Sequence, residues 1–214
     1  MFNGIKKMVQ SKVSSGRTSK RDSRSSGYSK GDAKREEILV GVMNALATGQ
    51  LRNPSLRAIG QALEMEPAHI LYYFGSREDL MMAVIVRWDE VMSGHAINDP
   101  PGDDFIDAYV EAIGKNQKQP GIVHLYLTFA AEAVDPNHPA HNFISERFER
   151  VKCNLAAAIR LEQEKGTMIA SFDADIEARL LIALADGLQL QSLIDPGIDS
   201  ASHLRTVIGQ LRHV

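Results

Sequence analysis

Side chains able to do acid–base, nucleophilic or metal chemistry are spread along this sequence without forming a catalytic pattern. Glu66 and His69 have the Glu-x-x-His spacing of one half of a di-iron bundle site, but a second copy of the pattern is absent. Asp135, His138 and His141 lie close enough in sequence to hold a metal, yet they alternate with prolines, which favours a loop and a helix cap. The sequence therefore predicts no catalytic residue, no metal site and no cofactor.

Three polar side chains recur at a helical interval. His124, Thr128 and Glu132 are four residues apart, so they share one face of a helix predicted over 121–134. Two interpretations stay open: a solvated face, or polar groups that converge on an apolar ligand pocket. The only cysteine, Cys153, lies on a long predicted helix between apolar positions and is interpreted as inert.

The elements that position these side chains are all predicted to be helices. Apolar residues recur at intervals of three and four, and alternating β-branched runs are absent. Glycine and proline clusters divide the chain into about nine helices. Their approximate ranges are 32–48, 55–63, 67–73, 76–92, 103–118, 121–134, 139–165, 173–194 and 199–212. The expected fold class is all-α.

The charge is distributed unevenly along the 214 residues. Residues 1–36 carry ten Lys and Arg against three acids, so the rest of the chain holds fourteen basic and twenty-four acidic side chains. A basic arm on an acidic body is common in proteins that bind nucleic acid, because the arm meets the phosphates. Residues 1–32, rich in Ser, Gly, Lys and Arg, are expected to be disordered in the free protein. The alternative is a solvated leader without a partner.

Membrane insertion and secretion are not expected. No stretch approaches 18 uninterrupted apolar residues, and the basic N-terminus lacks the apolar segment of a signal peptide. We therefore expect a cytoplasmic, nucleoid-associated protein without a membrane partner.

Two short predicted helices, 55–63 and 67–73, have the lengths and the tight connection of a helix-turn-helix. In that motif the first helix braces the second, and the second places polar side chains of its N-terminal part in the major groove of DNA. Because many helical hairpins share this spacing, the motif needs support from the residues around it.

That support comes from an ordered set of residues in and after the second helix. They are Ala62, Glu64-Met65-Glu66, Ile70-Leu71-Tyr72-Tyr73-Phe74, Ser76-Arg77-Glu78 and Leu80. With its flanks, the stretch 35–89 resembles the N-terminal DNA-binding domain of the TetR family of bacterial regulators. The segments 135–139, 146–148 and 186–191 resemble one branch of the family's ligand-binding domains more weakly.

The resemblance implies a domain organisation and a set of DNA contacts. It implies a DNA-binding domain over 33–80 after the basic arm 1–32, and a ligand-binding and dimerisation domain over 81–214. Phe74 occupies the position of a core aromatic. The DNA-contacting residues that it implies are Ser55 and Arg57 in the bracing helix, Pro67, Ala68, His69 and Tyr72 in the recognition helix, and Tyr73 and Arg77 beside it.

Two residues depart from the family pattern. Glu64 stands where the family has a turn glycine, so it must adopt an unfavourable backbone angle or reshape the turn. Glu66 opens the recognition helix where a Lys or Arg is often found, and its charge opposes phosphate binding unless it reads a cytosine amino group. Both departures put the affinity for DNA in question.

The resemblance also implies a pocket among the helices after residue 98, capped by the fourth predicted helix. Each candidate side chain has an alternative role in the ordinary core. The candidates are Trp88, Met92, Phe105, Tyr109, His124, Thr128, Phe129 and Glu132.

The predicted helix 173–194 is apolar nearly all round, so it must be covered on two sides, and a partner subunit is the simplest second cover. With 199–212 it is expected to form a four-helix bundle across a homodimer. The candidate interface residues are Leu181, Leu184, Leu188, Gln191, Leu204 and Ile208.

Together these features predict a ligand-responsive transcriptional regulator, most simply a repressor, that binds double-stranded DNA at a pseudo-palindrome as a homodimer and responds to a small molecule. The alternative, motivated by Glu64 and Glu66, is a helical small-molecule-binding or interaction protein that has lost specific DNA recognition.

Overall fold

The computed structural model describes residues 30–51, 54–93, 102 and 104–212. The predicted basic arm lies outside the described residues except for its last three, 30–32, which are helical. Most of the predicted linker around 98–103 also lies outside them. Within the described part of the chain the regular structure is helical apart from one isolated β-bridge, so the expected all-α fold is confirmed.

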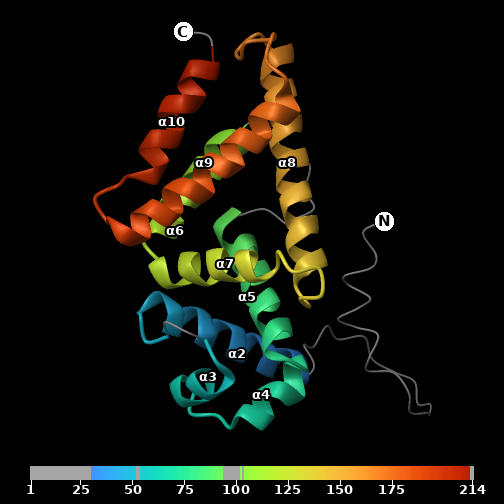
Figure 1. Ribbon diagram of the computed structural model, residues 1–214, viewed down its shortest axis with the longest axis vertical. Helices are drawn as coiled ribbons and strands as arrows, with labels where there is room; N and C mark the ends of the chain where they lie inside the picture. The colour runs from blue at the N-terminus through green and yellow to red at the C-terminus, as the bar shows by residue number, and fades with distance from the viewer. Residues whose placement is uncertain (1–29, 52–53, 94–101, 103, 213–214) are drawn as a thin grey trace, which may run out of the picture.

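The helices follow the predicted order with ends shifted by a few residues (Figure 1). The first helix begins at Lys30, earlier than expected. The bounds of the helices are α2 Lys30–Ala47, α3 Leu56–Ala62, α4 Pro67–Phe74, α5 Arg77–Ser93, α6 Phe105–Gln117, α7 Pro120–Glu132, α8 His141–Glu164, α9 Ala174–Ile194 and α10 Ser200–Leu211.

One end of the molecule is a small head formed by α2, α3, α4 and the start of α5 (Figure 1). Local sequence signals fix its turns. The Ser55 hydroxyl accepts a hydrogen bond from the Ala58 amide at 3.2 Å and caps α3. Pro67 occupies the first turn of α4, where its missing N–H is not needed. Gly75, at a φ of 83°, ends that helix in a conformation that a side chain would strain.

The other end is a bundle of α6, α8, α9 and α10 around a second apolar core. Figure 1 shows α7 lying across the molecule between this bundle and the head. Its first turn presses on the end of α2: a Cβ at Gly121 would lie 2.2 Å from the Leu46 carbonyl oxygen, so only glycine permits this approach.

Helix α5 belongs to both ends of the molecule. Leu80 and Val84 are buried against the head, whereas Trp88 lies further along the same helix beside α6. The boundary expected at residue 80 therefore falls inside one continuous helix, Arg77–Ser93. Helix α5 thus joins the head to the bundle as one continuous element.

Candidate functional site

Helix α4 presents a polar face to solvent and an apolar face to the head. Ile70 and Phe74 are buried, while Ala68 and His69 are exposed and Tyr72 is 80% exposed. A large aromatic side chain this exposed has little to contact within its own chain, which is typical of a binding surface. The side expected to face the groove is therefore the free side of the helix, with Pro67 half-buried in its first turn.

Three of the remaining predicted DNA contacts, Ser55, Tyr73 and Arg77, have structural partners within the head. Arg77 donates from Nε to the Pro54 carbonyl at 2.9 Å and pairs with Glu78 at 3.2 Å, so it holds the segment before α3. The Tyr73 side chain is half-buried, and its ring centroid lies 5.3 Å from the ring centroid of His69. In the bracing helix Ser55 is the cap described above, and Arg57 is exposed.

The turn between α3 and α4 retains its shape without the family's glycine. Glu64 adopts a φ of 51°, in the left-handed region, which confirms the first of the two alternatives expected for it. The Met65 amide donates to the Gly60 carbonyl at 2.8 Å across the turn. Glu66 is the N-cap residue of α4, yet it is exposed and its side chain makes no capping hydrogen bond, so its carboxylate stays available to solvent or DNA.

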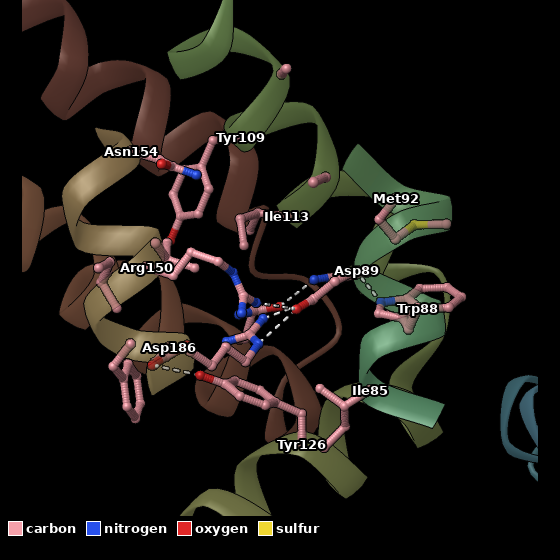
Figure 2. Close-up of a pocket in the computed structure, with 18 of the residues that line it drawn as sticks. Ile85, Trp88, Asp89, Met92, Tyr109, Ile113, Tyr126, Arg150, Asn154 and Asp186 are labelled. Atoms are coloured by element: carbon pink, nitrogen blue, oxygen red, sulfur yellow. Dashed lines mark hydrogen bonds and ion pairs between the residues drawn. The ribbon is translucent and has the colours of Figure 1, made fainter. Parts of the chain in front are cut away.

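A cavity of about 180 Å³ lies between α5, α6, α7, α8 and α9 (Figure 2). Four of the predicted pocket residues line it: Trp88 and Met92 from α5, and Phe105 and Tyr109 from α6. Ile113 and Phe148 extend the apolar wall. A largely apolar cavity with a few polar groups has the composition of a small-molecule site.

The other four pocket candidates lie elsewhere. His124, Thr128 and Glu132 are exposed on α7, and Phe129 is buried in the core shared with the head. Helix α7 instead faces the cavity through Ile122, Val123 and Tyr126, which lie on the opposite side from the polar stripe. The expectation that the stripe converges on the pocket is wrong, and its alternative, a solvated face, is correct.

The polar centre of the pocket is an ion-pair cluster that the sequence did not predict. Asp89 of α5 accepts two hydrogen bonds from Arg147 of α8, each 2.8 Å long. Arg150 lies 3.6 Å from the same carboxylate. Figure 2 shows the Arg150 side chain extending toward Asp89. Burial alone would lower the pKa of Arg147, but Asp89 holds that pKa above its ordinary value.

A second polar group faces Arg147 from the other side. The Tyr126 hydroxyl donates to Asp186 of α9 at 3.3 Å, and the Arg147 guanidinium lies 4.5 Å from the centroid of the Tyr126 ring. Burial raises the pKa of Asp186 to about 6, partly offset by Arg147. Burial also raises the pKa of Tyr126 and of Tyr109, so both remain neutral donors.

A chain of amide groups extends the polar network from α5 to α9. Trp88 donates from Nε1 to Asn116 Oδ1 at 2.8 Å, and Asn116 donates from Nδ2 to Gln189 Oε1 at 3.0 Å. Gln189 is only 3% exposed. Helix α5 is thus held to the bundle at two places, the amide chain and the Asp89 cluster.

One signal could have found these side chains. Arg147, Arg150 and Asn154 recur at intervals of three and four on α8 beside the apolar stripe of Phe148 and Val151. Asp186 is the only charged residue between Leu180 and Ile194 of α9. Charged residues so close to a buried face indicate an internal polar site.

The pH dependence of stability provides a test of the buried Asp186. Its folded-state pKa of about 6 stands above its ordinary value of 3.8, so the folded state holds the proton more tightly. This group therefore lowers stability as the pH rises from about 4 to 6, and the loss persists above pH 6. We expect Asp186→Asn to gain up to about 3 kcal/mol of unfolding free energy relative to the unmodified protein between pH 4 and pH 7. Urea unfolding of both proteins measures this difference, and a constant difference would contradict the assignment.

The predicted interface residues of α9 and α10 mostly face inward. Leu181, Leu188, Leu204 and Ile208 are buried within the protomer, where they pack in its own core. Leu184 is half-buried and Gln191 is exposed. The exposed apolar residues of α9 lie on its other side and are Ile176, Leu180, Leu190 and Ile194.

The side chains first considered for metal binding serve local structure. Asp135 accepts from the Asn137 amide at 2.9 Å, His138 Nδ1 accepts from the Ala140 amide at 3.2 Å, and His141 Nδ1 lies 2.8 Å from the Ala133 carbonyl oxygen. This is the loop and helix start expected for them. In the described ranges, no helix is both long and apolar enough to cross a bilayer.

An exposed helix-turn-helix surface joined by one helix to an internal pocket defines the class of ligand-responsive DNA-binding regulators. The chain belongs to the family of BetI-type transcriptional repressors, whose C-terminal domain model matches residues 104–211, half of the chain. It is thus a TetR-type regulator and not an enzyme, as the sequence predicted.

Solved structures support the fold. GusR of Salmonella enterica is 23% identical, with a TM-score of 0.62 over 86% of this chain and 97% of that one. A TetR-family regulator from Agrobacterium tumefaciens is 17% identical, with a TM-score of 0.67 over 86% and 100%. A regulator from Saccharomonospora viridis in complex with choline is 22% identical, with a TM-score of 0.62 over 83% and 94%. No curated protein matches the chain.

Proposed function

We propose that this regulator is a homodimeric repressor that binds a pseudo-palindromic operator through α3 and α4 and releases it when a small molecule occupies the pocket. The observation that carries the proposal is the position of Asp89. It lies on α5, the helix that continues into the DNA-binding head, and its two arginine partners lie on α8 in the wall of the pocket. A ligand that disturbs this cluster changes the position of α5.

The DNA-binding unit comprises residues 33–80, with Ser55, Arg57, Tyr73 and Arg77 near phosphates and the exposed face of α4 in the major groove. The side chains that read bases are Pro67, Ala68, His69 and Tyr72. Residues 81–214 bind the ligand and the partner subunit. The ligand site is lined by Trp88, Met92, Phe105 and Tyr109. Ligand binding shifts the equilibrium between two positions of the heads, and the size of the shift is set by the difference in the ligand's affinity for the two states.

The dimer interface is the exposed stripe of α9 rather than the residues first expected. Ile176, Leu180, Leu190 and Ile194 are each more than half exposed and recur at intervals that place them on one face of the helix. Gly187 lies between them, and a Cβ there would meet open space. An exposed apolar stripe of this length favours a second copy as its cover, in which α9 and α10 pair with their counterparts.

Two recognition helices in such a dimer contact half-sites about one DNA turn apart, roughly 34–36 Å. The test is selection of sheared genomic DNA from the source organism by the purified protein, followed by sequencing. Enrichment of one or a few palindromic sites supports the proposal. Enrichment without sequence preference would favour the alternative, a ligand-binding protein that has lost specific recognition.

The same selection gives a prediction for Tyr72. Tyr72→Ala removes a side chain that is 80% exposed and packs edge-on against the ring of the half-buried Tyr73, so the fold is expected to persist. We expect affinity for the selected site to fall by about five- to 150-fold, since a base contact is worth about 1–3 kcal/mol. Fluorescence anisotropy at fixed salt measures the change. Phe172→Ala is the control, because Phe172 is an exposed aromatic in the connection between α8 and α9, outside the head; equal losses in both variants would contradict the assignment.

A further inference from the structure

Three hydrogen-bond donors line the pocket without a hydrogen-bond partner among the described residues. They are the Arg150 guanidinium, the Asn154 side-chain amide and the Tyr109 hydroxyl. No described residue makes a hydrogen bond with any of the three side chains; the one ion pair of Arg150 is the 3.6 Å approach to Asp89. Arg150 and Asn154 are one turn apart on α8, and Figure 2 shows Tyr109 on the same side of the pocket.

The charges around these donors leave Arg150 undercompensated. The nearest carboxylate, Asp89, already accepts two short hydrogen bonds from Arg147. A second carboxylate that attracts Arg150, Glu146, is exposed on α8, and Asp186 accepts a hydrogen bond from Tyr126 instead. The Arg150 side chain is nevertheless only 17% exposed, and burial lowers its pKa, so the site holds a desolvated cation with a weak partner. Such a group gains most from an anion that supplies its missing hydrogen bonds.

The rest of the cavity sets the size and nature of the remaining part of the ligand. Phe105, Phe148 and Val151 also line the cavity, and Figure 2 shows Trp88 and Met92 across it from these donors. An engineered apolar cavity of about 150 Å³ holds benzene. A cavity of about 180 Å³ therefore has room for one ring and a small polar group.

We propose that the effector of this regulator is a small aromatic or similarly compact apolar carboxylate, with its carboxylate held by Arg150, Asn154 and Tyr109. The inference rests on the proposed function, since it names the ligand of that pocket. The carboxylate competes with Asp89 for Arg150 and thereby weakens the tie between α5 and α8. Arg150 then both binds the ligand carboxylate and, by leaving Asp89, frees the head to move.

The test measures binding of matched probes to the full chain by isothermal titration calorimetry at constant ionic strength. The probes are benzoate, phenylacetate and 3-phenylpropionate, each with the primary amide and the primary ammonium compound of the same length. We expect at least one carboxylate to bind at least about tenfold more tightly than both of its matches. If no carboxylate does so, or if an ammonium compound binds best, the inference is wrong.

Variants locate the site. Arg150→Gln is expected to lower carboxylate affinity to that of the amide, whereas Arg160→Gln, an exposed arginine on the same helix, leaves it unchanged. Should Arg150→Gln fail to fold, Tyr109→Phe removes one donor without a change of charge. This variant is expected to lower the affinity for the carboxylate about three- to tenfold and to leave the affinity for the amide unchanged. Full affinity in these variants would overturn the assignment. DNA binding measured without any probe tests the proposed function separately: a protein that binds its operator but prefers ammonium compounds refutes only this inference.

Discussion

Replacing Asp89 by Asn is expected to lower the free energy of unfolding by about 3 kcal/mol, the lower end of the range for breaking a buried ion pair. The change retains the shape of the side chain but removes the charge that compensates Arg147 and Arg150. The Asp89 and Arg147 side chains are 20% and 18% exposed, so water does not replace the lost partner fully. Urea denaturation monitored by circular dichroism measures the effect.

The control for this prediction is an exposed pair. Asp175→Asn breaks the pair with Arg160, whose side chains are about half exposed, and should cost less than about 1 kcal/mol. The double variant Asp89→Asn with Arg147→Gln should recover part of the loss, because no unpaired charge remains on Arg147. Additive losses in the double variant would show that the two residues do not act as a pair.

The second large effect is expected at the exposed stripe of α9. Leu180→Glu combined with Leu190→Glu places four charges in the proposed dimer interface, two from each protomer. Both leucines are more than half exposed in the protomer, so its own fold is expected to tolerate the change. We expect the dimer dissociation constant to rise at least about a hundredfold and operator binding to be lost with it. Light scattering coupled to size-exclusion chromatography measures the mass.

Ala131→Glu provides the matched control, since it adds a charge at an exposed apolar residue of α7. This variant should remain dimeric and bind DNA. If the α9 double variant also remains a dimer at micromolar concentration, the interface lies on another surface and the proposed pairing of α9 is wrong.

The order and type of the helices could be predicted because local signals determine them. The Ser55 cap, Pro67 in the first turn of α4 and Gly75 at its end are all recognisable in the sequence and appear in the structure in those roles. The strained backbone of Glu64 was also predictable, since a residue with a side chain stands at a turn that favours glycine.

The polar centre of the pocket could not be predicted from local pattern. Asp89 and Arg147 are separated by 58 residues, and only the packing of α5 against α8 brings them together. The polar stripe of α7 was misleading because three polar residues at intervals of four fit a solvated face as well as a pocket. The burial of Ile122, Tyr126 and Phe129 shows which face of α7 points inward, and periodicity alone does not distinguish the inward face from the solvated one.

The side of α9 that would meet a partner could not be predicted for a related reason. Helix α9 is apolar on nearly all sides, so its sequence does not show which side meets α8 and which remains outside. Leu181 and Leu188 are covered by the protomer's own helices, whereas Leu180 and Leu190 are not. Adjacent residues in the sequence thus have opposite environments, and only the tertiary packing separates them.

The central claim is that the state of the Asp89 cluster sets the position of the DNA-binding heads through α5. The most direct test is the distance between the two heads, measured by double electron–electron resonance with a spin label at Asn44→Cys, exposed on α2, in a Cys153→Ser background. We expect Asp89→Asn to shift the distance distribution and to weaken operator binding together. An unchanged distribution with unchanged operator affinity in this variant would contradict the claim.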